Sequence, residues 1–433
     1  MSFRGISAML LFSFTIPIVM KYRILPIEGT PYWLFGILFL CLIGYSLFSI
    51  FPEVISGLMN GKNKGINRKH EHSSIEVIRT TFLWVCIAIS LGGASITAIV
   101  DRHNIAPIWG THDIILQQEA AIRYLIQRKN PYKETYFGTP VEMFRYEEIG
   151  NTKAINPALY HFVMPPGYLV LPLPFYWVAN RMFGYFDGRM LLLFLMTIML
   201  YLLSKWFKRK DIAELAVIIT ALSPAATDYF IEGRSDLFAL VFLIGALFFL
   251  NKKTLYLSLF SFSLAILSKQ TMWFATPLYL TYVYVIHGYS WKKLLLPIAV
   301  IGGISMVVTG PFLVWDFQAF LSSVVFYLSA GGPTGYPVSG YGLSMILYSL
   351  GVIRDVHAYY PFQIWQFGIG IPVILLTVVV FLKRPSVSFF LIGFAITLFS
   401  FWYTSRYFNN SHIAVVAGLF ALGILKKYDE DIT

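Results

Sequence analysis

The chain has 433 residues, of which 57% are hydrophobic, 17% are aromatic and only 13% are charged. A soluble domain cannot bury that much apolar surface, so the composition excludes a soluble protein and indicates a polytopic membrane protein. The formal net charge is +11. Cytoplasmic loops of membrane proteins collect lysine and arginine, so we expect no nucleic-acid partner. Cys41 and Cys86 lie in apolar runs and predict neither a disulfide nor a metal site.

Apolar stretches long enough to cross a bilayer recur along the whole chain. We predict an all-α polytopic membrane protein with about twelve transmembrane helices (between about 11 and 13). The candidate segments are residues 6–20, 33–51, 79–100, 188–206, 212–229, 236–250, 255–268, 271–287, 293–314, 362–382, 387–403 and 412–425. Whether 6–20 spans the membrane is left open, and so is the role of two interrupted stretches, 165–184 and 340–353.

Basic clusters between these segments predict the orientation. If all of them are cytoplasmic, both termini are cytoplasmic too, provided that 165–184 does not cross. Lys21 and Arg23 are the exception, because they then lie outside. The clusters are Lys62, Lys64, Arg68 and Lys69; Lys205, Lys208, Arg209 and Lys210; Lys252 and Lys253; Lys292 and Lys293; Lys383 and Arg384; Lys426 and Lys427.

This orientation makes residues 101–187 a long outer loop. We therefore expect one transmembrane domain, 1–433, made of N-terminal spans (1–100), this outer loop and the remaining spans (188–433). Within the loop, four prolines and several aromatic residues in 165–184 favour an interfacial helix over a crossing one.

The stretch "THDIILQQEAAIRYLIQRKNPY", residues 111–132, predicts an amphipathic surface helix. Asp113 stands at its start. One interpretation is a helix N-cap, where the helix dipole favours a carboxylate. The other is a general base at the membrane boundary that accepts a proton from a hydroxyl. Glu119 on the same helix is a rival base, and Asp101 is a weaker one.

Four further polar clusters fall on the predicted outer side. Each has a structural alternative: a rigid turn, charges placed at a span end where they cost little, or a lysine that snorkels to the interface. The functional interpretation is a shared pocket whose cations bind phosphate. The candidate substrate-binding residues are Glu119, Tyr132, His161, Arg234, Asp236, Lys269, Gln270, Arg406, Asn410 and His412.

The order of these motifs resembles the GT-C superfamily of integral-membrane glycosyltransferases, in particular the polyprenol-phosphomannose-dependent α-mannosyltransferases. The resemblance covers roughly residues 80–280. The chain differs from the family in two ways: two apolar segments precede the loop-bearing span, and Asp113 has no acidic partner in the sequence. The motifs are an early loop aspartate (Asp113), "KNPY" (129–132), the "PP" turn (160–166), "FG" with Arg189, Ser223-Pro224 with Arg234 and Asp236, and Lys269-Gln270 before Pro277.

The resemblance implies an inverting glycosyltransferase of a prokaryotic plasma membrane with its active site on the outer face, and hence a role in cell-envelope biosynthesis. By this resemblance, Asp113 is the catalytic base and the donor is a polyprenyl-phosphate-linked sugar, with mannose expected first. The acceptor is a glycolipid, a glycan or a protein. No cofactor or divalent metal is expected, because the leaving group carries no pyrophosphate. The sugar, the linkage and the oligomeric state are left open.

Two other classes of function are weighed against this one. A transporter or flippase of lipid-linked saccharides is the alternative, although such proteins usually show broken helices at matching positions in two repeated halves. The interrupted stretches here do not match in that way. A non-catalytic membrane subunit of an envelope assembly would not need the outer acid and base groups.

Overall fold

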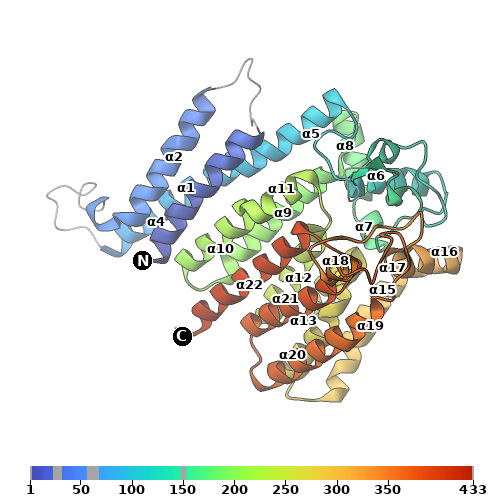
Figure 1. Cartoon of the computed structure of the whole chain (residues 1–433). Coiled ribbons are helices and arrows are strands. Elements are labelled where there is room, and N and C mark those ends of the chain that lie inside the picture. Colours follow the sequence, from blue (N-terminus) through green and yellow to red (C-terminus); the bar gives the residue numbers. More distant parts are fainter. Residues whose placement is uncertain (1, 23–31, 56–67, 148–152, 432–433) are drawn as a thin grey trace.

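A computed structural model describes residues 2–22, 32–55, 68–147 and 153–431, except that the side chains of residues 68–73 are not described. The described chain is mostly helical, with only two pairs of two-residue strands (Figure 1). This architecture agrees with the predicted all-α class. Of the predicted features, Arg23, Lys62 and Lys64 lie outside the described residues.

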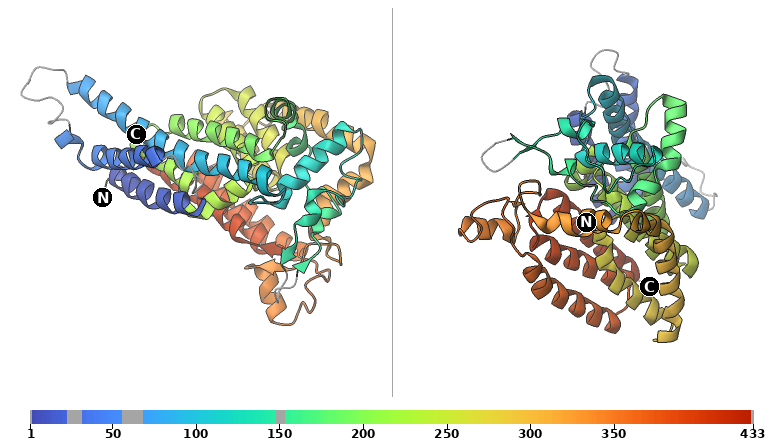
Figure 2. Two further views of the ribbon diagram at one scale, coloured as in Figure 1. Left: turned by 90° about the horizontal axis from the view of Figure 1, so that it is seen from above. Right: turned by 90° about the vertical axis from the view of Figure 1, so that its right-hand side faces the viewer.

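The N-terminal helices form a layer along one side of the bundle (Figures 1 and 2). Its elements are α1 (Phe3–Tyr22), α2 (Tyr32–Ile50), α4 (Arg68–Ile87), the π-turn η1 (Ala88–Gly92) and α5 (Gly93–Ile105). Residues 74–105 make one long helical run that carries the chain to the opposite end of the bundle.

The loop region at that opposite end contains only short elements, apart from α6. These are α6 (Asp113–Ile126), η2 (Pro140–Met143), the antiparallel strands β1 (Tyr146–Glu147) and β2 (Lys153–Ala154), η3 (Pro157–Leu159), α7 (Gly167–Val170) and α8 (Leu173–Phe183). An 11-residue helix such as α8 is about 16 Å long, too short to cross a bilayer core of about 30 Å. Its Trp177, Met182 and Phe183 are exposed, as an interfacial helix requires.

The remaining helices pack beside α1 as a bundle. The first group is α9 (Gly188–Trp206), α10 (Lys210–Leu222), α11 (Pro224–Glu232), α12 (Asp236–Asn251), α13 (Leu255–Ser268), η4 (Gln270–Ala275) and α14 (Thr276–Ile286). The second group is η5 (Trp291–Leu294), α15 (Leu295–Trp315), α16 (Phe317–Leu321), η6 (Ser322–Phe326), α17 (Tyr327–Ala330), β3 (Ser339–Gly340), α18 (Leu343–Ser349), α19 (Gln363–Trp365), η7 (Gln366–Gly370), α20 (Ile371–Lys383), α21 (Val387–Tyr403), β4 (Tyr407–Phe408) and α22 (Asn410–Asp431).

Each of the twelve predicted segments falls on helix. Within the described residues, seven helices are long and apolar enough to cross a membrane, or up to eight if α10 and α11, bent by 52° at Pro224, form one broken span. Helices α12, α13 and α21 are apolar but shorter. The structure thus supports a helical membrane protein, and the number twelve stays a prediction.

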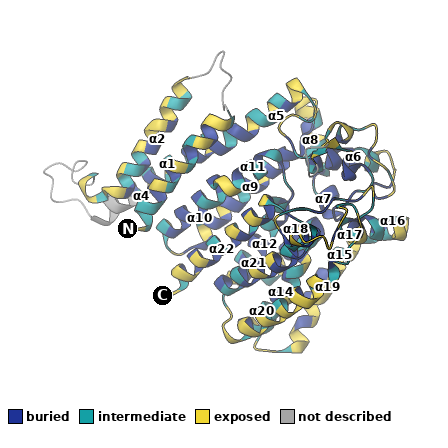
Figure 3. Ribbon diagram, in the orientation of Figure 1, coloured by how far each residue is buried: buried dark blue, intermediate teal, exposed yellow. Residues whose placement is uncertain are grey.

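The helices have two kinds of surface, which differ in how far their residues are buried (Figure 3). The faces between helices form one continuous apolar core. By contrast, α15 and α20 expose Val307, Val314, Leu375 and Leu376, each at least 60% accessible. Outward apolar side chains of this kind suit contact with lipid.

Both termini lie at one end of the bundle, and the outer-loop elements lie at the other (Figure 1). Lys426 Nζ donates to the Trp206 carbonyl at 3.0 Å, which joins the end of α22 to the end of α9. At the opposite end Lys21, the exception to the predicted charge pattern, is neutralised by an ion pair with Asp228 of α11. The orientation predicted from the basic clusters stays a prediction.

Candidate functional site

Asp113 is the first residue of α6, but it is not the N-cap. His112 has the extended backbone angles of an N-cap residue (φ −84°, ψ 149°), and its Nδ1 lies 3.3 Å from the Ile114 amide nitrogen, so His112 occupies the N-cap position of the helix. The N-cap interpretation of Asp113 is therefore wrong. The carboxyl lies in the first turn, where the helix dipole still favours a negative charge, and it is only 3% exposed.

Three side chains hold the Asp113 carboxylate. His112 Nδ1 is 2.6 Å from Oδ1. The Tyr146 hydroxyl and the Asn156 amide donate to Oδ2 at 3.2 and 3.1 Å. Burial alone would raise the pKa of this carboxyl, but His112, Asn156 and Tyr146 together outweigh it and hold the pKa below its usual value. Asp113 is therefore ionised at neutral pH.

The loop after α6 supplies two of these partners. Tyr146 comes from the β1–β2 hairpin, and Asn156 precedes η3, where its Oδ1 also accepts from the Ala158 amide at 2.9 Å. That second bond fixes which way the Asn156 amide faces. Our sequence analysis missed His112, Tyr146 and Asn156. Only His112 carried a visible signal, a histidine directly before the aspartate at a predicted helix start.

Glu119 belongs to a different set of contacts. Both oxygens pair with Arg102 at 2.8 Å, and the Gly188 amide donates to it at 3.3 Å. Arg102 also pairs with Asp187 at 2.8 Å, and Asp187 pairs with Arg189 at 2.7 Å. All four side chains are buried. This ion network ties α5, α6 and α9 together and leaves Glu119 no free oxygen for a substrate.

Arg234 lies beside the start of α6. Gly233 ends α11 in the left-handed conformation (φ +91°), and a Cβ there would meet Ile115 of α6 at 2.4 Å, so only glycine fits. The Glu232 carbonyl accepts from the His112 amide at 2.7 Å. These contacts place Arg234, which is 25% exposed, next to the Asp113 site.

The Arg234 guanidinium has spare hydrogen-bonding capacity. It lies over the Tyr229 ring at 4.7 Å and donates to Ser411 Oγ at 3.3 Å. Its contact with Glu232 is 3.6 Å long, and the buried Nε has no hydrogen-bond partner among the described residues. A guanidinium with unused donors can bind an anionic ligand.

Asp236 and Lys269 form an ion pair near Arg234. Lys269 Nζ is 2.5 Å from Asp236 Oδ1, and both side chains are nearly buried. The charges of Lys269, His412 and Arg234 all act on the Asp236 carboxyl. The predicted residues Arg234, Asp236, Lys269 and His412 are thus brought together, as the sequence analysis expected.

Aromatic rings connect the two halves of this region. Tyr146 contacts Tyr336 and Tyr336 contacts Tyr407, both at 5.8 Å between ring centres, and Tyr407 lies 5.9 Å from His412. His412 is itself buried against Trp402 at 4.5 Å. The result is an aromatic wall, Tyr146–Tyr336–Tyr407–His412, between the Asp113 and Asp236 groups.

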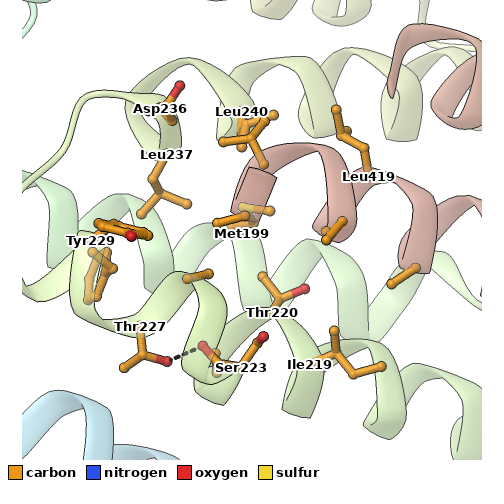
Figure 4. Close-up of a pocket in the computed structure, with 18 of the residues that line it drawn as sticks. Met199, Ile219, Thr220, Ser223, Thr227, Tyr229, Asp236, Leu237, Leu240 and Leu419 are labelled. Carbon is orange, nitrogen blue, oxygen red and sulfur yellow. Dashed lines mark hydrogen bonds between the residues drawn. The ribbon is translucent and has the colours of Figure 1, made fainter. Parts of the chain in front are cut away.

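An apolar groove of about 370 Å³ runs from Arg234 and Asp236 between the helices (Figure 4). Most of its lining is aliphatic or aromatic, from α1, α9, α10, α11, α12 and α22, and includes Phe14, Met199, Tyr229, Leu240 and Leu419. Only its polar end carries charge. The volume is within the range of about 300–1,000 Å³ usual for ligand pockets.

Two polar pockets meet this groove at Arg234. One, of about 500 Å³, is lined by His112, Arg145, Tyr146, Glu147 and Glu232. The other, of about 480 Å³, is lined by 337–341 and 409–411, including the exposed Asn410. Arg234 lines the groove and both pockets, so it is the point where the apolar and polar spaces join.

Four predicted site residues have structural partners instead. The three guanidinium nitrogens of Arg406 donate to the carbonyls of Tyr336, Val356 and Ala358, so the expectation that Arg406 binds phosphate is wrong. Tyr132 donates to the Met164 carbonyl, and Gln270 to those of Val163 and Val324. Glu119 is the fourth, within its ion network.

His161 lines neither the apolar groove nor the two polar pockets. Its Nδ1 is 3.0 Å from Ser323 Oγ, and its ring packs on Tyr327 at 4.3 Å. Burial lowers the pKa of His161, so the ring is neutral near pH 7 and is not a cation for phosphate.

Comparison with family models, curated proteins and solved structures finds no match to this chain. The likeness to the GT-C superfamily therefore stays a resemblance of motifs. In the described part of the chain, no three His, Cys, Asp or Glu side chains gather where they could hold a metal ion. The expectation of metal-free chemistry stays a prediction.

Proposed function

We propose that this protein is an inverting glycosyltransferase of the membrane. It moves a sugar, mannose in the first instance, from a polyprenyl-phosphate donor to a glycolipid, glycan or protein acceptor on the outer face. The observation that carries the proposal is the junction at Arg234. An apolar groove ends there at an arginine whose Nε has no hydrogen-bond partner among the described residues, and a polar pocket begins that reaches His112, next to Asp113.

Each part of the junction fits one part of the donor. The groove takes the polyprenyl chain, because its lining is apolar along the helices. Arg234 binds the phosphate, with Lys269 close by through Asp236. The sugar then lies along the aromatic wall, whose tyrosines offer ring faces and hydroxyls.

The chemistry is a single displacement. The acceptor hydroxyl loses its proton to the His112–Asp113 pair, and its oxygen bonds to the anomeric carbon. The bond from that carbon to the phosphate oxygen breaks, so the anomeric configuration inverts. The leaving polyprenyl phosphate gains a negative charge, which Arg234 stabilises more strongly than the charge of the donor.

The test is transfer of label by purified protein in detergent. Wild-type protein receives short-chain polyprenyl phosphate carrying radiolabelled mannose, with a membrane-lipid extract of the source organism as acceptor. We expect a labelled product from wild type and at least about 100-fold less from Asp113→Asn. The matched control is Asp101→Asn, which removes an outer carboxylate from α5 and should keep activity.

Two results would contradict the proposal at different levels. If Asp113→Asn is as active as wild type, the assignment of the reactive site is wrong. If wild type transfers nothing from mannose, glucose or pentose donors, the transporter alternative gains support, since a groove with a charged end also suits a carrier of lipid-linked saccharides. A flux assay in liposomes then decides.

A further inference from the structure

His112 and Asp113 are not equally accessible to a ligand. The Asp113 side chain is 4% exposed, whereas that of His112 is 21% exposed. Both Asp113 oxygens already have partners. His112 lines the polar pocket that meets Arg234. A hydroxyl bound in that pocket therefore reaches the imidazole before it reaches the carboxylate.

The distances determine which ring nitrogen carries the proton. His112 Nδ1 and Asp113 Oδ1 are 2.6 Å apart, and two acceptors approach this closely only with a proton between them. The Ile114 amide is farther from the same nitrogen, at 3.3 Å. Because the pKa of Asp113 is lowered, although burial alone would raise it, the carboxylate is ionised and the proton lies on Nδ1.

A neutral imidazole with its proton on Nδ1 has a lone pair on Nε2. Among the described residues, Nε2 has no hydrogen-bond partner. Its charged neighbours in the pocket are Arg145, Glu147, Glu232 and Arg234. The arrangement is a base aimed at a pocket, with a buried carboxylate behind it that fixes the tautomer.

We propose that His112 is the catalytic base of this site, and that Asp113 is a positioning residue that orients the ring. The inference rests on the proposed glycosyl transfer and names the atom that receives the proton. Nε2 takes the proton of the acceptor hydroxyl as the new C–O bond forms and the phosphate leaves. The resulting imidazolium is stabilised by the Asp113 carboxylate, and then releases the proton to water in the pocket.

The first test uses His112→Asn and His112→Ala in the transfer assay. Asparagine is a good N-cap, so His112→Asn keeps the start of α6 while it removes the base. We expect both variants to lose about 100-fold or more in kcat with little change in KM for the donor. The matched control is His103→Asn, since His103 is exposed on α5 and stacks on Tyr185.

The second test is rescue of His112→Ala by imidazole added to the assay. We expect the rate to rise with the concentration of neutral imidazole, while Asp113→Asn is not rescued. A purely structural His112 gives no such rescue.

Near wild-type activity of His112→Asn overturns the assignment of His112 and leaves Asp113 as the direct base. Failure of the proposed function looks different, because wild type itself then shows no transfer from any lipid-phosphate sugar. Loss of activity in His112→Ala without rescue by imidazole also contradicts a base role for His112.

Discussion

Helix α6 carries two buried carboxylates, Asp113 and Glu119, whose surroundings differ. Glu119 is locked to Arg102 through both oxygens. Asp113 is held by a tyrosine, an asparagine and a histidine that lines a pocket. A carboxylate paired with a permanently charged guanidinium stabilises structure. One paired with an imidazole can take part in proton transfer. Whether a buried carboxylate is structural or reactive therefore depends mainly on the side chain with which it pairs.

The largest effect we predict concerns Glu119, the carboxylate with the structural role. Glu119→Gln leaves Arg102 with a reduced counter-charge in a buried site, and should lower stability by about 3–5 kcal/mol. The measurement is the unfolding temperature and the yield of monodisperse protein in detergent. Glu134→Gln, in the same outer region but without an ion pair among those described, is the control and should change stability by less than about 0.5 kcal/mol. An unchanged unfolding temperature in Glu119→Gln would contradict this role.

The second largest effect is expected when the Arg234 cation, where the groove meets the polar pockets, is removed. Arg234→Gln should lower transfer by about 100-fold, because the leaving phosphate loses its charge partner. Stability should change little, since the Arg234 side chain is 25% exposed. Transfer kinetics with varied donor concentration measure the effect. Arg181→Gln, at an exposed position of α8, is the control. Activity of Arg234→Gln within about threefold of wild type would remove Arg234 from the donor site.

A smaller effect concerns the hydrogen bond from Tyr146 to Asp113. Tyr146→Phe removes one donor from the carboxylate while it keeps the ring in the aromatic wall. A hydrogen bond to a charged group contributes about 1.5–3 kcal/mol, so we expect a loss of about tenfold in kcat. Steady-state kinetics at fixed pH provide the measurement. A rise in KM alone would instead assign Tyr146 to substrate binding.

The smallest expected effect is a pH dependence of stability. The folded-state pKa of Asp113 is lower than usual, because His112 and the two hydrogen bonds outweigh the effect of burial. Its contribution to stability is therefore complete above the unfolded-state pKa of about 3.9, and is lost as pH falls through the lower folded-state pKa. Unfolding temperatures across acidic pH should fall less steeply in Asp113→Asn than in wild type. Parallel curves would contradict the lowered pKa.

The helices could be predicted from the sequence because apolar length alone identifies them, and each of the twelve segments falls on helix. The number of helices that cross a membrane could not be predicted, because α12, α13 and α21 are short and the chain bends at Pro224. Asp113 and Arg234 were found from their places at element ends. Tyr146 and Asn156 were not, because they approach Asp113 from 33 and 43 residues away.

Arg406 is the opposite case, a residue that the sequence analysis assigned to the site and that the structure places elsewhere. In the sequence it is a cation at an outer turn, and nothing nearby satisfies it. In the fold, three carbonyls from residues 336–358 surround its guanidinium. Backbone partners carry no signature in the sequence, so a buried structural arginine and a ligand-binding one look alike until the loops are placed.

The comparison of Asp113 with Glu119 is tested most directly by measuring transfer per folded molecule for Asp113→Asn and Glu119→Gln side by side. We predict that Asp113→Asn keeps most of its stability and loses at least about 100-fold in rate, while folded Glu119→Gln is less stable and retains a rate within about threefold of wild type. The reverse pattern, an active Asp113→Asn and a stable but inactive Glu119→Gln, would contradict the account.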